Sequence, residues 1–171
     1  MLRVFESFSG YGSQSIALRN LGIEYKVVAI SEIDKYAIKA YETIHGPANN
    51  LGDICKIDPK DIPDHDLFTY SFPCQDLSVA GKQAGLGKGT RSGLLYECEK
   101  IIEAKKPKYL LLENVKNLVG KKFKPQFDEW LDYLESLGYT NYWQVLNAKN
   151  YGVPQNRERV FVISILGEHE T

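Results

Sequence analysis

Short apolar runs alternate along this chain with segments in which apolar residues recur every three or four positions. The apolar runs predict strands at six places: residues 2–8, 25–30, 67–72, 108–112, 142–146 and 160–166. The segments with helical spacing predict helices around residues 16–21, from 34 to 45, from 92 to 105 and over 127–137. This alternation predicts an open, mostly parallel α/β sheet with helices on both faces.

Local signals support some of these limits. Asp34 is a good N-cap for the second helix, and Gly138 is a suitable C-cap for the fourth. Residues 47–66 are rich in turn formers, with one short strand expected near Ile54. Residues 73–91 contain four glycines and little periodicity, which predicts a long loop of the kind that usually carries function.

Length and composition limit the class of protein. The 171 residues fit one domain, residues 1–171, and 43% hydrophobic with 25% charged residues is ordinary globular usage. No run of about 18 apolar residues exists, so no membrane span is expected. The three cysteines, Cys55, Cys74 and Cys98, form no CxxC pair, so neither a disulfide framework nor a metal site is predicted. A reduced, cytoplasmic setting follows.

Charge is unevenly distributed, although the net charge is only −1. Residues 77–124 hold eleven basic and four acidic side chains, a local charge of +7, whereas the rest of the chain carries −8. A basic middle can form a phosphate-binding face that the total conceals. Lysines that only offset a helix dipole would explain part of the same pattern.

Candidate chemistry lies where predicted strands end, because ligands of open α/β sheets bind there. The first such place is the glycine loop, residues 8–12, whose two glycines either let a ligand approach the backbone or simply form a tight turn between strand and helix. Ser15 stands where a GxGxxG motif needs its third glycine, which disfavours a standard dinucleotide site. Glu32 follows the second strand and could accept hydrogen bonds from a ribose or cap the next helix. Asp53 could accept from an adenine amino group or serve only as a turn residue.

Three further candidates follow later strands. Cys74 lies in a polar strand-end loop, where a stabilised thiolate could act as a nucleophile. Glu113 ends an apolar strand and could hold a proton for donation. Arg157 and Arg159 occupy alternate positions, so they could hold a phosphate or a carbonyl oxygen together, or form surface ion pairs with Glu158 or the acidic C-terminus.

Seven segments in order resemble the DNA cytosine-5 methyltransferase family: FESFSGYGSQSIAL, SEID, GDI, SFPCQDLS, RSGLLYE, LLENVKNL and QNRERVF. They run from residue 5 to residue 161, so the resemblance covers essentially the whole chain. It implies a Rossmann-like S-adenosylmethionine-dependent sheet with an antiparallel final strand. The implied cofactor site contains Phe8, Gly10, Tyr11, Gly12, Glu32, Ile33, Asp53, Ile54, Pro73 and Leu94.

By the same resemblance, Cys74 adds to carbon 6 of a flipped cytosine in double-stranded DNA, and Glu113 hydrogen-bonds the ring. Arg157 and Arg159 then orient the base and support Cys74. A soft thiolate suits this addition, which turns the ring into an enamine whose carbon 5 can take a methyl group. Residues 75–91 resemble the mobile loop that closes over DNA in the family, and the DNA contacts expected in it are Gln75, Ser78, Lys82, Lys88 and Arg91.

Full-length members of the family continue well beyond QNRERVF, with a target-recognition region and a returning C-terminal segment. The chain is therefore expected to be a fragment or one part of a split enzyme, inactive alone, with some apolar surface exposed near the first helix. An RNA cytosine methyltransferase and a non-catalytic module with the same fold remain alternatives. Roles in host restriction–modification, phage self-protection and regulation also remain open.

Overall fold

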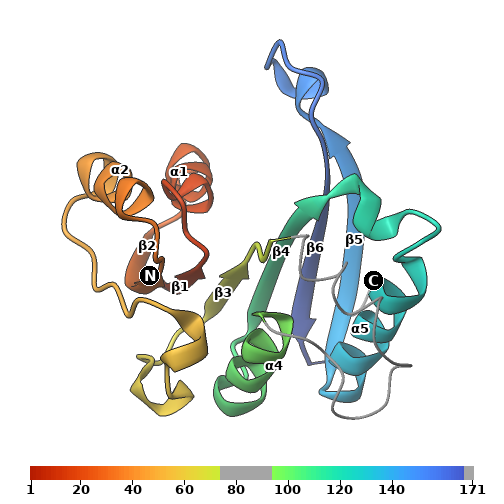
Figure 1. Ribbon diagram of the computed structural model, residues 1–171, viewed down its shortest axis with the longest axis horizontal. Helices are drawn as coiled ribbons and strands as arrows, with labels where there is room; N and C mark the ends of the chain where they lie inside the picture. Colours follow the sequence, from red (N-terminus) through yellow and green to blue (C-terminus); the bar gives the residue numbers. More distant parts are fainter. Residues whose placement is uncertain (74–93, 168–171) are drawn as a thin grey trace.

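The computed structural model describes residues 1–73 and 94–167, which form one six-stranded sheet (Figure 1). The strand order is β2-β1-β3-β4-β6-β5. The strands are β1 (Leu2–Ser7), β2 (Tyr25–Ser31), β3 (Leu67–Tyr70), β4 (Tyr109–Val115), β5 (Tyr139–Asn147) and β6 (Glu158–Leu166). Strands β1 to β4 pair in parallel, and β6 is antiparallel to both β4 and β5. The predicted mostly parallel sheet with an antiparallel final strand is confirmed.

Four helices accompany the sheet in the described residues: α1 (Ser13–Asn20), α2 (Lys35–His45), α4 (Leu94–Lys105) and α5 (Lys124–Ser136). Four short 3-10 turns join the elements: η1 (Ile54–Lys56), η2 (Pro59–Asp61), η3 (Lys116–Val119) and η4 (Ala148–Tyr151). Asp34 caps α2 as predicted, because its carboxylate accepts hydrogen bonds from the Tyr36 and Ala37 amides at 2.8 and 2.9 Å. None of the described helices is long and apolar enough to cross a membrane.

Two local predictions are corrected. The strand expected near Ile54 is the 3-10 turn η1, because the Asp53 side chain accepts a hydrogen bond from the Cys55 amide and closes the chain into a turn. Helix α5 begins at Lys124, three residues before the predicted start, because Pro125 is tolerated in the first turn of a helix.

Helices cover both faces of the sheet, as predicted. Along β4 the side chains alternate, so Leu110 and Leu112 are fully buried on the face that packs against α4 and α5. Trp130 of α5 closes this core and donates its indole N–H to the Tyr70 hydroxyl at 3.2 Å. Figure 1 shows α1 and α2 beside β1 and β2 instead, so the helices cover the other face only in part. The exposed remainder of that face bears on the site described below.

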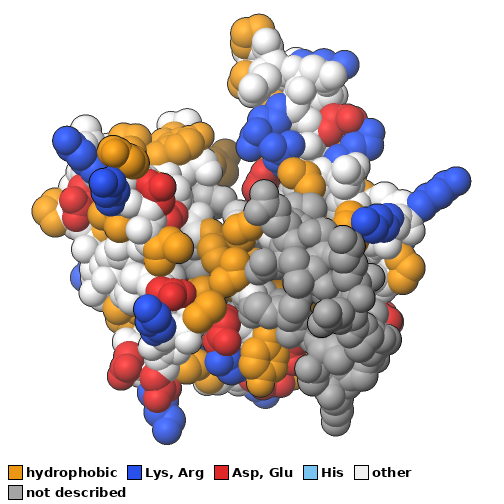
Figure 2. Space-filling view, viewed as in Figure 1, with side chains coloured by type: hydrophobic (Ala, Val, Ile, Leu, Met, Phe, Trp, Pro, Cys, Tyr) orange, Lys and Arg blue, Asp and Glu red, His pale blue; other side chains and the backbone are white. Residues whose placement is uncertain are grey.

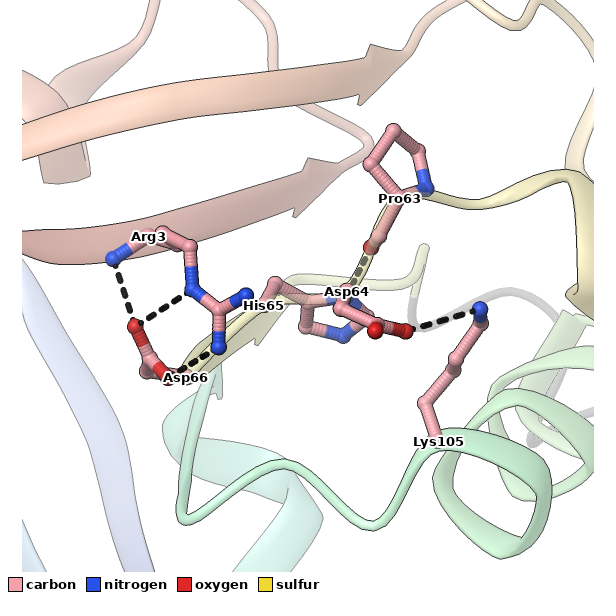
Figure 3. Close-up of polar contacts among 6 residues, drawn as sticks. All are labelled: Arg3, Pro63, Asp64, His65, Asp66 and Lys105. Atoms are coloured by element: carbon pink, nitrogen blue, oxygen red, sulfur yellow. Dashed lines mark hydrogen bonds and ion pairs between the residues drawn. The ribbon is translucent and has the colours of Figure 1, made fainter.

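Polar contacts at the amino ends of β1 and β3 stabilise the end of the sheet that lies opposite to the candidate site (Figure 3). Arg3 donates two side-chain hydrogen bonds to Asp66, at 3.1 and 2.7 Å, which lower the pKa of that carboxyl to about 2. His65 is buried against the stacked rings of Phe5 and Phe68, and its Nδ1 donates to the Pro63 carbonyl oxygen at 2.8 Å. Burial lowers the pKa of the His65 imidazole.

Candidate active site

The glycine loop lies between the end of β1 and the start of α1. Gly10 and Gly12 have φ angles of +54° and +79°, in the left-handed region that favours glycine. Phe8 adopts φ +52°, which is uncommon for an aromatic residue. The Gly12 amide donates to the Ser9 carbonyl oxygen at 2.8 Å and closes the loop into a tight turn. The loop therefore lies at the carboxyl end of β1, where the sequence predicted a ligand, with Gly10 half-buried and Gly12 buried.

Glu32 joins this loop to the end of β2. Its Oε2 accepts a hydrogen bond from the Gly10 amide at 2.9 Å, and its Oε1 accepts from the amides of Ile33 and Asp34 at 2.8 and 3.0 Å. A carboxylate offers about four acceptor sites, so one remains open at Oε2. Both interpretations of Glu32 thus have support, since it orders the backbone before α2 and also lies against the glycine loop.

Asn50 holds the same strand end in place, and the sequence analysis missed it. The Asn50 Nδ2 donates to the Glu32 carbonyl oxygen at 3.0 Å, while its Oδ1 accepts from the Glu32 and Gly52 amides at 3.1 and 3.0 Å. Asn50 therefore fixes Glu32 relative to the loop that leads to Asp53. A pair of asparagines in a turn-rich segment was the only signal in the sequence.

The remaining predicted cofactor residues lie in different environments. Ile33 is 75% exposed beside Glu32, whereas Ile54 is 3% exposed and packs in the main core. Pro73 is exposed at the last described position before residue 74. Leu94 begins α4 and is half-buried against the core.

An ion pair marks the carboxyl end of β4. The Arg159 Nε of β6 lies 3.1 Å from the Glu113 Oε1, and each side chain is about one-fifth exposed. Arg159 also donates to the Glu158 carbonyl oxygen at 2.8 Å. The Glu158 carboxylate pairs with Lys116 at 2.9 Å instead. A surface ion pair between Arg159 and the Glu158 carboxylate, the simpler interpretation of this motif, is therefore wrong.

A second residue that the sequence analysis missed is Asn114. It is 4% exposed, and its Nδ2 donates to the Phe72 carbonyl oxygen at 3.0 Å. Its Oδ1 accepts from the Val115 amide at 2.8 Å. Asn114 thus links β4 to the backbone just before Pro73. The chain separation of 42 residues explains why no local pattern could reveal this contact.

An apolar groove of about 860 Å³ opens on the sheet face that α1 and α2 leave uncovered. Aliphatic and aromatic side chains of α1, β4 and β6 line it, among them Leu18, Tyr109, Leu111, Phe161 and Ile163. Glu113, Arg157 and Arg159 also line the groove. Both arginines therefore border the same groove. Figure 2 shows Lys and Arg side chains gathered over the projecting ends of β5 and β6.

Several predicted residues lie outside the described ranges: Cys74, Gln75, Ser78, Lys82, Lys88 and Arg91. The two described cysteines are poor nucleophile candidates. Cys55 is exposed, but partial desolvation raises the pKa of its thiol, and complete burial raises the pKa of Cys98 as well. Within residues 1–73 and 94–167, no cluster of three His, Cys, Asp or Glu side chains could hold a metal ion.

A glycine loop and a carboxylate at adjoining strand ends of an open α/β sheet define the broad class of nucleoside-binding α/β proteins. Residues 2–171 match the family of C-5 cytosine-specific DNA methylases, and the chain belongs to that family.

Curated relatives agree with this assignment. The chain is 49% identical to the type II methyltransferase M2.ScrFI of Lactococcus lactis subsp. cremoris, over 99% of this chain and 62% of the relative. It is 42% identical to the orphan methyltransferase M.Rho11sI of Bacillus phage rho11s, over 96% of this chain and 33% of that protein. The chain thus spans between one third and two thirds of the length of these relatives.

A solved structure supports the fold. The crystal structure of the S. pombe Dnmt2 methyltransferase superposes with a TM-score of 0.80 over 99% of this chain and 51% of that one. The sequence identity is 24%, so this likeness concerns the fold alone.

Proposed function

We propose that this chain is the catalytic portion of a DNA cytosine-5 methyltransferase, which transfers a methyl group from S-adenosylmethionine to carbon 5 of cytosine. The observation that carries the proposal is the arrangement of Glu32 against the glycine loop and of Glu113 against Arg159, at the carboxyl ends of β2 and β4. Family membership gives this arrangement its chemical meaning.

The described residues fit the cofactor. Open space surrounds the position where a Cβ of Gly10 would stand, so a ligand can approach the backbone there. Ser9 is 5% exposed, and its hydroxyl has no hydrogen-bond partner among the described residues. Glu32 would accept a ribose hydroxyl at its open Oε2 site, while Ile33 offers an exposed apolar surface for the adenine. S-adenosylmethionine would supply an electrophilic methyl group.

The base would lie near Glu113 and Arg159. The Cys74 thiolate would add to carbon 6 of cytosine, while Glu113 hydrogen-bonds ring nitrogen 3 and takes part in proton transfer there. Carbon 5 of the resulting enamine would accept the methyl group, and loss of the carbon 5 proton would then expel the thiolate. Arg159 would hold Glu113 in position through their 3.1 Å ion pair. Asn114 would set the backbone that leads to Cys74 by binding the Phe72 carbonyl oxygen.

Double-stranded DNA would bind at the carboxyl ends of the parallel strands, where Glu113 and Arg159 lie. The target base must be flipped out of the duplex, which costs a few kcal/mol. Gln75, Ser78, Lys82, Lys88 and Arg91 would offset part of that cost by contacting the DNA. The basic side chains over the ends of β5 and β6 extend the same surface (Figure 2). In the chain, Lys149 of η4 and Arg157 lie between these two strands. DNA as the substrate agrees with a cytoplasmic location.

A further C-terminal segment or a second subunit would complete the enzyme. The curated relatives extend beyond the matched region, and the apolar groove between α1 and β6 has the character of a protein interface. Such a segment or subunit would read the DNA sequence and close the groove. The catalytic portion alone is therefore expected to fold but not to methylate DNA at a specific site.

Covalent trapping tests the proposal. The chain, supplemented with a separate polypeptide carrying the rest of the Lactococcus relative, should form a covalent adduct with duplex DNA containing 5-fluorocytosine when S-adenosylmethionine is present. Cys74→Ala should lose the adduct, whereas Cys55→Ala should keep it. Cys74→Ser should still bind S-adenosylhomocysteine with nearly unchanged affinity. Adducts with transfer RNA but not with DNA would make RNA the substrate, and an adduct that survives Cys74→Ala would overturn the mechanism.

A further inference from the structure

A polar network under the glycine loop joins α1, α2 and β1. Its buried part is centred on Glu6 of β1, which is fully buried and accepts hydrogen bonds from the Ser15 hydroxyl at 2.9 Å and the Tyr41 hydroxyl at 2.6 Å. Burial raises the pKa of Glu6. Through Glu6, one residue of α1 and one residue of α2 are fixed to the same strand.

A second connection lies one helical turn further along both helices. Arg19 follows Ser15 by four residues on α1, and His45 follows Tyr41 by four residues on α2, so each pair shares a helix face. The Arg19 Nη2 lies 2.9 Å from the His45 Nδ1, and the rings of Tyr41 and His45 are 4.4 Å apart. The two helices are thus connected at two successive levels beside the loop.

His45 is also the residue that contacts the loop itself. Its Nε2 lies 2.9 Å from the Tyr11 carbonyl oxygen, between the two left-handed glycines. A Cβ on Gly12 would press on the His45 Nε2 and lie 2.7 Å from the Tyr41 Cε2, so the loop backbone rests directly on the end of α2.

The hydrogen-bonding chemistry fixes which nitrogen of His45 carries the proton. An arginine side chain only donates, so the His45 Nδ1 must accept. A carbonyl oxygen only accepts, so the Nε2 must donate to Tyr11. Both contacts are satisfied together by the neutral imidazole with its proton on Nε2.

We propose that His45 is a positioning residue of the cofactor loop, and that Arg19 acts through it by selecting the tautomer that holds the Tyr11 carbonyl oxygen. This inference rests on the proposed function, because it assigns the loop to S-adenosylmethionine. His45 contacts the loop at the Tyr11 carbonyl oxygen and is itself held by Arg19, so it sets where the loop backbone lies relative to Glu32 on the opposite side.

Conservative replacements separate positioning from general stability. In Gln, the amide nitrogen is as many bonds from Cα as the His Nε2, so His45→Gln keeps the donor that faces Tyr11. In Asn, the amide lies at the level of Nδ1, so His45→Asn keeps only a partner for Arg19. His45→Leu removes both groups. Lys39→Ala, on an exposed position of the same helix, is the matched control.

The first measurement is calorimetric titration of the full chain with S-adenosylhomocysteine. His45→Asn and His45→Leu should each weaken binding roughly fivefold or more, the effect of losing about one hydrogen bond. His45→Gln and Lys39→Ala should stay within about twofold of the unsubstituted chain. Equal affinities for His45→Asn, His45→Leu and the unsubstituted chain would overturn the proposal.

Two further measurements need no ligand, so they decide the proposal even if the cofactor assignment fails. Imidazole nitrogen-15 shifts should show the Nε2–H tautomer of His45, and Arg19→Leu should lower its share, because only the Tyr11 carbonyl oxygen then favours it. Hydrogen exchange at the Gly12 amide should accelerate in His45→Asn and His45→Leu but not in His45→Gln. An Nδ1–H tautomer in the unsubstituted chain, or unchanged exchange in all variants, would contradict it. Absence of S-adenosylhomocysteine binding in the unsubstituted chain would instead refute the proposed cofactor site.

Discussion

The Asn114 side chain donates a 3.0 Å hydrogen bond to the Phe72 carbonyl oxygen, so a residue of β4 holds the backbone that follows β3. Its neighbour Glu113 pairs with Arg159 and lines the groove instead. Because successive side chains of a strand point to opposite faces, two adjacent residues serve different parts of one site. Glu113 would act on the base, and Asn114 would position the chain segment that carries Cys74.

Asn114→Leu should therefore impair both stability and catalysis. The Phe72 carbonyl oxygen would lose its partner in a buried setting, which costs about 1–3 kcal/mol of unfolding free energy. The rate of covalent trapping on 5-fluorocytosine DNA should fall further than the affinity for S-adenosylhomocysteine, because the cofactor contacts lie elsewhere. Asn117→Ala, an exposed asparagine in η3, should change neither quantity. Normal trapping by a destabilised Asn114→Leu would limit Asn114 to a structural role.

Glu32→Ala should weaken binding of S-adenosylhomocysteine by about 1–3 kcal/mol, the range for losing hydrogen bonds to a charged group. Two causes act together, since the ribose would lose an acceptor and the Gly10 amide would lose the bond that orients the loop. Calorimetry measures the first effect and hydrogen exchange at Gly10 measures the second. Glu42→Ala, on an exposed position of α2, is the control. Unchanged affinity combined with a lower melting temperature would make Glu32 a helix cap only.

Alanine at the two loop glycines should have unequal effects. Both positions have positive φ, so each substitution costs about 1–2 kcal/mol from backbone strain. At Gly10 the added methyl group would meet no atom within 4 Å, whereas at Gly12 it would collide with His45 and Tyr41. Gly12→Ala should therefore cost a further 1–3 kcal/mol, roughly, from overpacking. Chemical denaturation of both variants checks the order, and a less stable Gly10→Ala would contradict it.

The sequence predicted those parts of the fold that depend on local chemistry. Asp34 was recognisable as a cap because its partners are two and three residues away. The strand ends identified Glu32 and Glu113, because ligand sites of open α/β sheets follow a general rule. The strand predicted near Ile54 was wrong, because one hydrogen bond from the Cys55 amide to the Asp53 carboxylate decided between a strand and a turn.

Contacts between distant segments were not predictable in this way. His45 resembled an ordinary residue at the end of an amphipathic helix, and its contact with Tyr11 spans 34 residues. Asn114 was visible as part of a motif, but only the pairing of β4 beside β3 brings it to Phe72. Such residues depend on strand order and helix placement, which a single sequence specifies only through the whole fold.

His65 should make the protein less stable in mildly acidic solution. Burial lowers the pKa of His65 in the folded state, while an unfolded histidine has a pKa near 6.5. Below about pH 6.5 the unfolded chain therefore binds more protons than the folded chain, and the unfolding free energy decreases as the pH falls. Denaturation at a series of pH values should show this loss, and His65→Phe, which keeps an aromatic ring against Phe5 and Phe68 without titrating, should remove it.

Asp66, next to His65 at the same end of the sheet, should change the stability in a different pH range (Figure 3). Its folded pKa of about 2 lies below the ordinary value of 3.8, so its contribution is complete above about pH 4 and is lost as the pH falls towards 2. Asp66→Asn should therefore flatten the stability profile only in the strongly acidic range and leave the loss near pH 6 intact. The two substitutions should act on separate pH ranges, because the two pKa values are lowered from different starting points. Burial lowers the pKa of His65, whereas the Arg3 hydrogen bonds lower the pKa of Asp66. If one of these variants abolished the loss of unfolding free energy in both pH ranges, His65 and Asp66 would act through one shared protonation step.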